Sequence, residues 1–430
     1  MLISFEVENY GPFRDRTTLA LPAPKATDAP IITTPLAQRV PSVAMIFGPN
    51  ASGKTSLLDA LVALSIAVEQ SHRGWDPAGG TNARPFLLQP DVQGTASTWR
   101  ITFLADDAAG EPGQYEYTVS MDTDAVLEEG LRFKPAATRR FRTLFQRRGQ
   151  LVTARSKGLA DIATQMRPNS LLLSVAAQEN QSVVMPAYEW LTRRVLRARG
   201  LGTTEAHRYA LNELIRSEHL PLVRELVAKA DLGITDVRGE ALTEERSAEL
   251  RAVTRTLQEA IPGIRLEGPR GEFSALEFGH AGQDGRIYYL PDALESEGTR
   301  AFITAGLLAA QALLTGGLVV LDELDGSLHP TLVDEIVGQF RSPLTNPLGA
   351  QLIASSHDTH QMGRNSLEPL SRHEVWLTEK DATGVSSLFR LSDFQDVRPN
   401  VDQEHRYLAG IYGALPRPSL AGSELESVPR

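Results

Sequence analysis

Cysteine is absent from all 430 residues of the chain. Disulfide bonds and thiolate metal sites are therefore excluded. The longest apolar stretch, residues 305–321, contains Gln311 and a Gly316-Gly317 break, so it predicts a helix followed by a strand and not a membrane span. The start of the chain also lacks the basic residues, apolar core and cleavage site of a secretory signal, and we expect a cytoplasmic protein with no membrane partner.

Basic residues are outnumbered, since 43 Lys and Arg stand against 53 Asp and Glu and give a net charge of −10. This balance argues against a protein that coats nucleic acid. The hydrophobic share of 42% suffices for a large core, and a chain of this length predicts two structural units. Internal repeats and sustained heptads are absent from the sequence, so no long coiled-coil arm is encoded.

A glycine-rich segment occupies residues 48–55 and reads Gly48-Pro49-Asn50-Ala51-Ser52-Gly53-Lys54-Thr55. It fits the pattern G-x-x-x-x-G-K-[ST], in which backbone N–H groups turn toward phosphate oxygens, Lys54 reaches the outer phosphates and Thr55 holds Mg²⁺. The apolar run at 42–47 predicts a buried strand before the segment, and apolar residues at helical spacing predict a helix after it. Because the helix N-terminus then points at the anion, this order indicates a phosphate-binding loop and not a chance glycine turn.

A second predicted strand, residues 317–321, ends in the acidic pair Asp322 and Glu323. Ligands bind at the carboxyl ends of strands in open α/β sheets. There Asp322 would hold Mg²⁺, through water, and Glu323 would orient or deprotonate the attacking water. The alternative is a solvated strand end.

A third predicted strand, residues 351–356, delivers His357 to the same kind of position. An imidazole there can hydrogen-bond a γ-phosphate or the attacking water. The rival interpretation is a metal cluster formed with His329, Asp358 and His360. The lack of cysteine and the spacing of these residues, which matches no compact zinc pattern, speak against it.

The segment Ser296-Glu297-Gly298-Thr299 precedes another predicted helix. A Ser-x-Gly turn at a helix start offers a hydroxyl and free N–H groups, which are the ingredients of a second anion site. On its own, the same turn is an ordinary helix N-cap.

A basic stretch without Asp or Glu extends from residue 131 to 160. It would suit contact with the phosphate backbone of DNA or RNA, or with an acidic partner. The alternative is the solvated face of β-hairpins. A smaller cluster of arginines at 193–199 has near-helical spacing, which favours a surface face of a helix. The basic residues of the longer stretch are Arg132, Lys134, Arg139, Arg140, Arg142, Arg147, Arg148, Arg155 and Lys157.

These motifs together resemble those of ABC-type ATPases in the SMC/RecF/OLD branch. The glycine-rich loop resembles Walker A, residues 294–299 the signature, residues 321–330 Walker B with the D-loop, and residues 355–358 the switch histidine. The opening residues 1–13 resemble the start of bacterial AAA-family ATP-binding proteins associated with abortive infection and restriction-linked phage defence. Residues 170–180 and 407–416 also resemble segments of these ATP-binding proteins.

The resemblance implies a head-to-tail dimer in which ATP and Mg²⁺ lie between two copies, so ATP would favour the dimer and hydrolysis would release it. In the signature, Glu297 and Thr299 replace the residues usual in transporters, which favours the SMC-like branch. A Q-loop role for Gln89 is a guess. The catalytic residues implied are Lys54, Glu323 and His357. The nucleotide-binding residues implied are Gly48, Asn50, Ser52, Gly53, Lys54, Thr55 and Ser56 of one copy, with Ser296, Gly298 and Asp325 of the other.

The function implied is a Mg-dependent ATPase that acts as sensor or motor of a phage-defence module whose destructive activity lies on a separately encoded effector. One alternative is a RecF-like DNA-binding repair ATPase. Another is an OLD-type nuclease, although the roughly seventy residues after His357 are too few for the metal-binding domain it would need. The signature segment and His357 speak against a small-molecule kinase.

The predicted fold is α/β: a P-loop ATPase head with a mixed sheet, flanking helices, an antiparallel β subdomain and a helical insertion. Strands are expected at 98–103 and 115–119, and a mostly helical stretch from about 168 to 261, with short strands around 264 and 288. The expected division is 1–129 for the first half of the head, 130–291 for the basic β segment and helical insertion, 292–395 for the second half, and 396–430 for a C-terminal tail. This tail is expected to be loose after Pro416.

Overall fold

The computed structural model describes residues 1–25, 27–89, 95–163, 165–199, 201, 233–241, 248, 252, 274–291, 294–394 and 401–415. The chain divides into two units. The first comprises Met1–Val195 and Ile353–Arg430, and the second comprises Leu196–Leu352. Most of the predicted helical stretch after residue 201, the predicted strand near 264 and the predicted tail after 416 fall outside the described residues.

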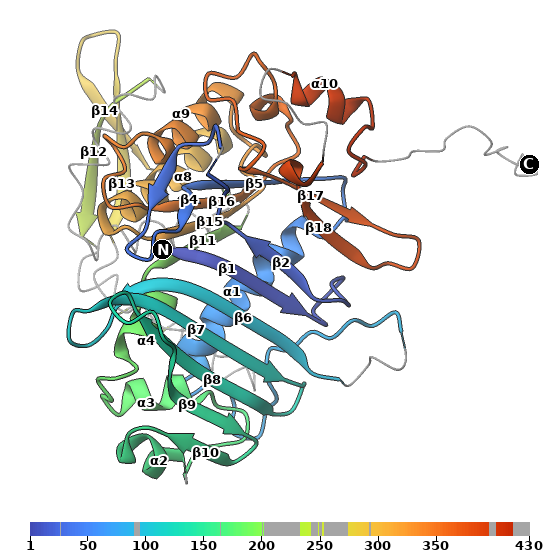
Figure 1. The fold of residues 1–430 in the computed structure, drawn as a ribbon. Coiled ribbons are helices and arrows are strands. Elements are labelled where there is room, and N and C mark those ends of the chain that lie inside the picture. Colours follow the sequence, from blue (N-terminus) through green and yellow to red (C-terminus); the bar gives the residue numbers. More distant parts are fainter. Residues whose placement is uncertain are drawn as a thin grey trace, which may run out of the picture. The chain divides into compact units, whose positions relative to one another are not determined.

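The larger sheet of the first unit is antiparallel and has seven strands in the order β10-β9-β8-β7-β6-β1-β2 (Figure 1). The strands β6 and β7 contain the segments predicted at 98–103 and 115–119. In β1 the residues Ile3, Phe5 and Val7 are buried, as their alternation predicts. The bounds are Leu2–Glu8 for β1, Thr17–Ala20 for β2, Ser97–Asp106 for β6, Pro112–Met121 for β7, Val126–Pro135 for β8, Arg142–Arg148 for β9 and Leu151–Ala154 for β10.

The second sheet of the first unit is mixed. Its strands lie in the order β16-β5-β17-β18, where β5 (Val43–Phe47) and β17 (Val375–Lys380) are parallel and β17 and β18 (Ser386–Arg390) are antiparallel. Every residue of β5 is buried, as expected for a strand with parallel partners. The boundary between the units falls within β16 (Gln351–Ser355).

Helix α1 (Lys54–Gln70) lies against the antiparallel sheet (Figure 1). The indole N–H of Trp99 on β6 donates to the carbonyl of Ala60 in α1 at 3.1 Å. On α1 as well, the Ser65 hydroxyl donates to the carbonyl of Leu191 in α4 at 2.7 Å. The remaining elements of this unit are β3 Ile31–Thr33, β4 Arg39–Pro41, α2 Lys157–Ala163, α3 Leu172–Gln178, α4 Met185–Arg193, the short helices η3 His360–Met362 and η4 Leu391–Asp393, and α10 Gln403–Leu408.

The second unit carries its own three-stranded antiparallel sheet, β12-β13-β14, and the neighbouring strands β11 and β15. The predicted helix after Ser296 is confirmed as α8, and a further helix, α9, follows His329. The stretch predicted as mostly helical is interrupted by the strand β11. The last two arginines of the 193–199 cluster, Arg197 and Arg199, therefore lie on a strand and not on a helix face. The bounds are β11 Val195–Arg199, β12 Ile234–Ala241, β13 Ser274–Ala281, β14 Ile287–Pro291, α8 Glu297–Thr315, β15 Leu318–Asp322 and α9 Pro330–Arg341.

The α/β class, the mixed sheet and the antiparallel β subdomain predicted from the sequence are confirmed. The division of the chain into the segments 1–129, 130–291, 292–395 and 396–430 stays a prediction. In the division into two compact units, residues 130–195 belong to the first unit together with residues 1–129. Among the helices that the structure describes, none combines the length and apolar character that a bilayer span requires.

A buried ion pair ties the antiparallel sheet to α3. The carboxylate of Glu129 on β8 accepts hydrogen bonds from the Tyr117 hydroxyl at 2.9 Å and from the N–H groups of Leu172 and Leu173 at 2.6 and 2.9 Å. Nη1 of Arg147 on β9 lies 3.5 Å from the same carboxylate, and both side chains are fully buried. Burial raises the pKa of the Glu129 carboxyl, while the charge of Arg147 acts in the opposite direction.

The same network reaches the C-terminal end of α1. The Ser71 hydroxyl accepts from the N–H of Leu171, and the Ser71 carbonyl accepts from the Ser170 hydroxyl, both at 3.1 Å. Arg147 donates to the Ser170 carbonyl. Because α1 begins at the predicted phosphate loop, this network fixes the far end of the helix that carries the loop.

We expect Arg147→Met to destabilise the protein by about 3–5 kcal/mol, because Glu129 would keep a buried charge without its partner. The loss should be clearly smaller in the double variant Glu129→Gln/Arg147→Met. It should also shrink in the single variant as the pH falls, since a carboxyl with a raised folded-state pKa gains stability on protonation. Urea unfolding of the variants tests this. Equal stabilities for the single and double variants would contradict it.

Candidate nucleotide-binding site

The glycine-rich loop lies between β5 and α1, in the predicted order. Its backbone is left-handed at three positions, with φ of 148° at Gly48, 62° at Ala51 and 113° at Gly53. Gly53 is the N-cap of α1 and provides no side-chain hydrogen bond to the helix. The first N–H groups of α1 therefore lack the usual side-chain cap, which suits an anion at this end.

Lys54 and His357 come together at this loop. The Lys54 side chain is buried, and its Nζ donates to the carbonyls of Gly48 at 2.7 Å and Pro49 at 3.2 Å. The same Nζ lies 3.4 Å from Nδ1 of His357. The lysine thus folds back over its own loop, and the exposed imidazole lies within reach of whatever the ammonium binds.

The position of His357 is set by its neighbours in the chain. The N–H of Ser356 donates to the carbonyl of Ile46 on β5 at 3.0 Å, which registers the end of β16 against the strand that leads into the loop. The Thr359 hydroxyl donates to Oε1 of Glu404 in α10 at 2.8 Å. The segment with His357 is therefore held on both sides.

The other loop residues implied by the resemblance lie around the start of α1. Asn50 is exposed at the tip of the loop. Thr55 and Ser56 are half-buried in the first turn of the helix, and their contacts to metal and phosphate stay predictions. Gln89 accepts a hydrogen bond from Nη1 of Arg14 at 3.2 Å, and its Q-loop role stays a guess.

Asp322 and Glu323 belong to the second unit, at the carboxyl end of the fully buried strand β15. Asp322 is 7% exposed. Glu323 is exposed and has φ of 54°, a left-handed conformation that is uncommon for a residue with a Cβ atom. Such strain persists only where the surroundings impose it, and it often marks a functional residue.

The signature-like segment and the predicted D-loop pack against each other within the second unit. Ser296 is the N-cap of α8, and its hydroxyl accepts from the N–H of Thr299 at 3.1 Å. The Ser327 hydroxyl donates to Oε1 of Glu297 at 3.2 Å. A Cβ atom at Gly298 would lie only 3.0 Å from the Ser327 carbonyl oxygen, so a larger residue would push the two segments apart.

Ser296 therefore has the capping role that the sequence left as the alternative, and this does not exclude an anion at the same helix end. Asp325 lies between Glu323 and Ser327 in the same turn, half-buried. The rival metal cluster of histidines and Asp358 finds no support: no three His, Asp or Glu side chains gather as metal ligands in the part of the chain that the structure describes.

Much of the basic stretch is neutralised within the antiparallel sheet. Arg132 pairs with Glu116, Arg142 with Asp107 at 2.7 Å, and Arg148 with Glu128 at 3.5 Å. Arg147 is the buried partner of Glu129, and Lys134 lies over the Phe141 ring. These pairs support the hairpin interpretation over a surface for nucleic acid.

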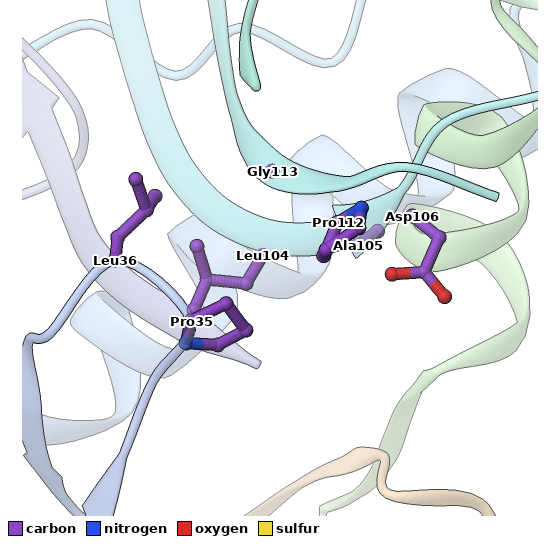
Figure 2. A pocket seen from close by; sticks show the side chains of 7 residues that line it. All are labelled: Pro35, Leu36, Leu104, Ala105, Asp106, Pro112 and Gly113. Carbon is purple, nitrogen blue, oxygen red and sulfur yellow. The ribbon is translucent and has the colours of Figure 1, made fainter. Parts of the chain in front are cut away.

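A small pocket of the first unit lies between the turn Pro35-Leu36 and the facing ends of β6 and β7 (Figure 2). Its volume is about 120 Å³. Asp106 is the one charged residue that lines it, and its lining offers no basic side chain for a phosphate.

Sequence reasoning missed the hairpin β17–β18 beside the loop. Oγ of Ser52 and Oγ1 of Thr378 are 2.6 Å apart, although the residues are 326 positions apart in the chain. Ser386 at the start of β18 approaches Gly53. No local signal marks either residue, because their placement follows from strand pairing and not from a motif.

A strand, a left-handed glycine-rich loop with a buried lysine, and an uncapped helix together define a P-loop ATPase head. Residues 43–362, more than half of the chain, match the family described as "AAA domain, putative AbiEii toxin, Type IV TA system", and the chain belongs to this family. It is thus an AAA-type P-loop ATPase, a class that binds nucleotide and usually Mg²⁺.

Among solved structures, the chain is similar to the SMC head domain from Thermotoga maritima. The match has 13% sequence identity and a TM-score of 0.39 and covers 90% of this chain and 98% of that chain. Similarity at this level carries no argument about function or assembly. A search of curated proteins gives no match.

The strain at Glu323 can be measured. We expect Glu323→Gly to be about 1 kcal/mol more stable than Glu323→Ala, because both lack the carboxylate but only glycine adopts this φ without a Cβ penalty. Chemical unfolding of the two variants makes the comparison. An alanine variant as stable as the glycine variant would show that Glu323 is not strained.

Proposed function

We propose that this protein is a Mg-dependent ATP hydrolase whose catalytic site is completed by a second copy of the chain. The observation that carries the proposal is the meeting of Lys54 and His357 at the start of α1. Nζ of Lys54 rests on the carbonyls of Gly48 and Pro49, and a phosphate would offer this ammonium stronger, charge-assisted bonds.

In this proposal the loop backbone and Lys54 bind the triphosphate, and Thr55 and Asp322 hold Mg²⁺. The metal, when bound, neutralises charge on the β- and γ-phosphates. Glu323 orients the attacking water and accepts its proton, so that the water oxygen bonds to the γ-phosphorus as the bond to the β-phosphate oxygen breaks. His357 hydrogen-bonds the γ-phosphate.

The second copy would contribute the start of α8 and the D-loop. Ser296 and Glu297 are exposed at that helix start, and the helix dipole favours a negative charge there. The packing of Gly298 against Ser327 makes the two segments one surface, so Ser296, Gly298 and Asp325 would meet the partner's nucleotide together. ATP would then act as the ligand that stabilises the dimer.

We further propose, on the resemblance described above, that the ATPase serves as sensor or motor of a phage-defence module with a separate effector. The nuclease alternative would need a cluster of acids, and such a cluster is lacking among the described residues. The DNA-repair alternative would need free basic side chains, and four arginines of the basic stretch are paired with carboxylates.

We expect the Glu323→Gln protein to shift from one subunit to two on addition of Mg-ATP, because it binds nucleotide but hydrolyses it slowly. Light scattering of the purified protein measures the mass directly. The added change Ser296→Arg should abolish the shift, since it places a bulky cation at the proposed interface. A mass independent of Mg-ATP in Glu323→Gln would contradict the ATP-dependent dimer.

We expect Lys54→Ala to abolish hydrolysis and to weaken ATP binding at least about a hundredfold, because a charge-assisted contact to phosphate is worth roughly 3 kcal/mol. Phosphate release and fluorescence titration with a labelled nucleotide give both quantities. Lys380→Ala, at the end of β17, is the matched control and should behave as the wild type. Hydrolysis that persists in Lys54→Ala would contradict the assignment of the site.

A further inference from the structure

The strand β17 extends beyond the end of β5 and continues beside the glycine-rich loop. The two strands are parallel, and Val375, Trp376 and Leu377 pair with Met45, Ile46 and Phe47. The next residue of β17 is Thr378, and the next after β5 is Gly48. The register therefore places Thr378 beside the first residue of the loop.

Thr378 contacts the loop through its hydroxyl. Its Oγ1 is 2.6 Å from Oγ of Ser52 and donates a longer bond of 3.3 Å to the carbonyl of Phe47. Thr378 is 0% exposed and Ser52 is 1% exposed, so water cannot replace this contact. A buried hydroxyl that loses its partner costs considerably more than an exposed one.

Close packing on the same side leaves the loop little freedom. A Cβ atom at Gly48 would lie 2.4 Å from the carbonyl oxygen of Thr378, which no real Cβ tolerates. At the other end of the loop, a Cβ atom at Gly53 would lie 2.9 Å from Oγ of Ser386 and 3.1 Å from Cζ of Phe13. The hairpin thus touches both ends of the loop.

The hairpin is itself anchored. The N–H of Ser386 donates to the carbonyl of Pro12 at 2.8 Å, in the turn that follows β1. On β17, directly after Thr378, Oε2 of Glu379 accepts from the N–H of Ala414 at 3.3 Å. A support that is fixed at two points can hold the loop in one conformation.

We propose that Thr378 is a positioning residue for nucleotide binding: its hydroxyl holds Ser52, and with it the neighbouring backbone N–H groups, in the conformation that receives phosphate. This inference rests on the proposed function for its ligand. Because the hydroxyl is fully buried against the loop, its loss should act on the arrangement of the loop before binding and leave the chemical step in place.

The test compares Thr378→Val, which keeps the shape and removes the hydroxyl, with Thr378→Ser, which keeps the hydroxyl. We expect Thr378→Val to raise KM for Mg-ATP about tenfold with kcat changed less than about twofold, and Thr378→Ser to restore KM. Thr102→Val is the matched control, because Thr102 is also a buried threonine on a strand of the first unit, on β6 and away from the loop.

A second readout needs no nucleotide. Hydrogen exchange of peptides covering residues 47–56 should be faster in Thr378→Val than in the wild type, Thr378→Ser and Thr102→Val. Ser52→Ala removes the same bond from the loop side, and should speed exchange equally, with no further gain in the double variant Ser52→Ala/Thr378→Val. This pair keeps the test available if one variant fails to fold.

Unchanged exchange in both Thr378→Val and Ser52→Ala would overturn the inference, and so would a fall in kcat with KM unchanged. If the wild type binds no Mg-ATP, the proposed function fails, and the exchange measurement alone then decides whether Thr378 positions the loop. The two failures are thereby distinguished.

Discussion

The parallel pairing of β5 with β17 is the constraint on which the candidate site depends. It places the hairpin β17–β18 against the glycine-rich loop on one side, while the bond from Ser356 to Ile46 places the end of β16 on the other. The loop therefore leaves a central strand between two fixed neighbours. Its left-handed glycines follow from this packing as well as from the need to turn N–H groups toward an anion.

The ends of α1 are held by different means. At its start, the loop is shaped by close contact between backbone and hairpin, and Nζ of Lys54 donates to the carbonyl of Gly48. At its end, the helix is bound through Ser71 to a buried network that includes Arg147 and Glu129. Buried ion pairs contribute little net stability, but removal of one partner is costly, so such a network specifies one arrangement. A helix fixed at both ends can present its N-terminus with little reorganisation.

The parts of the site that the sequence predicted are those encoded by neighbouring residues. The strands β5, β15 and β16, the helices α1 and α8, and the glycine-rich loop all follow from apolar runs, spacing and capping residues within short windows. The meeting of Lys54 with His357 could also be anticipated, because strand ends share one edge of a sheet. The roles of Glu323, Ser296 and Asp325 remain predictions.

What the sequence did not reveal depends on long-range pairing or on burial. Thr378 and Ser386 look like ordinary strand residues until β17 is paired with β5. The basic stretch suggested an exposed cationic surface, yet Arg147 is fully buried. The acids that neutralise the stretch lie on neighbouring strands and, for Asp107, in the turn after β6. The strand β11 lies in a stretch whose local pattern is typical of a helix. Pairing with a neighbouring strand overrides such a local preference, so the sequence alone did not predict it.

The central claim is that the loop at residues 48–55 binds the phosphates of ATP through Lys54. The most direct measurement is a crystal structure with Mg²⁺ and a non-hydrolysable ATP analogue. The account predicts that Nζ of Lys54 leaves the carbonyls of Gly48 and Pro49 and bonds to phosphate oxygens at the start of α1. A nucleotide bound elsewhere, or a Lys54 that still rests on the Gly48 carbonyl with nucleotide present, would contradict it.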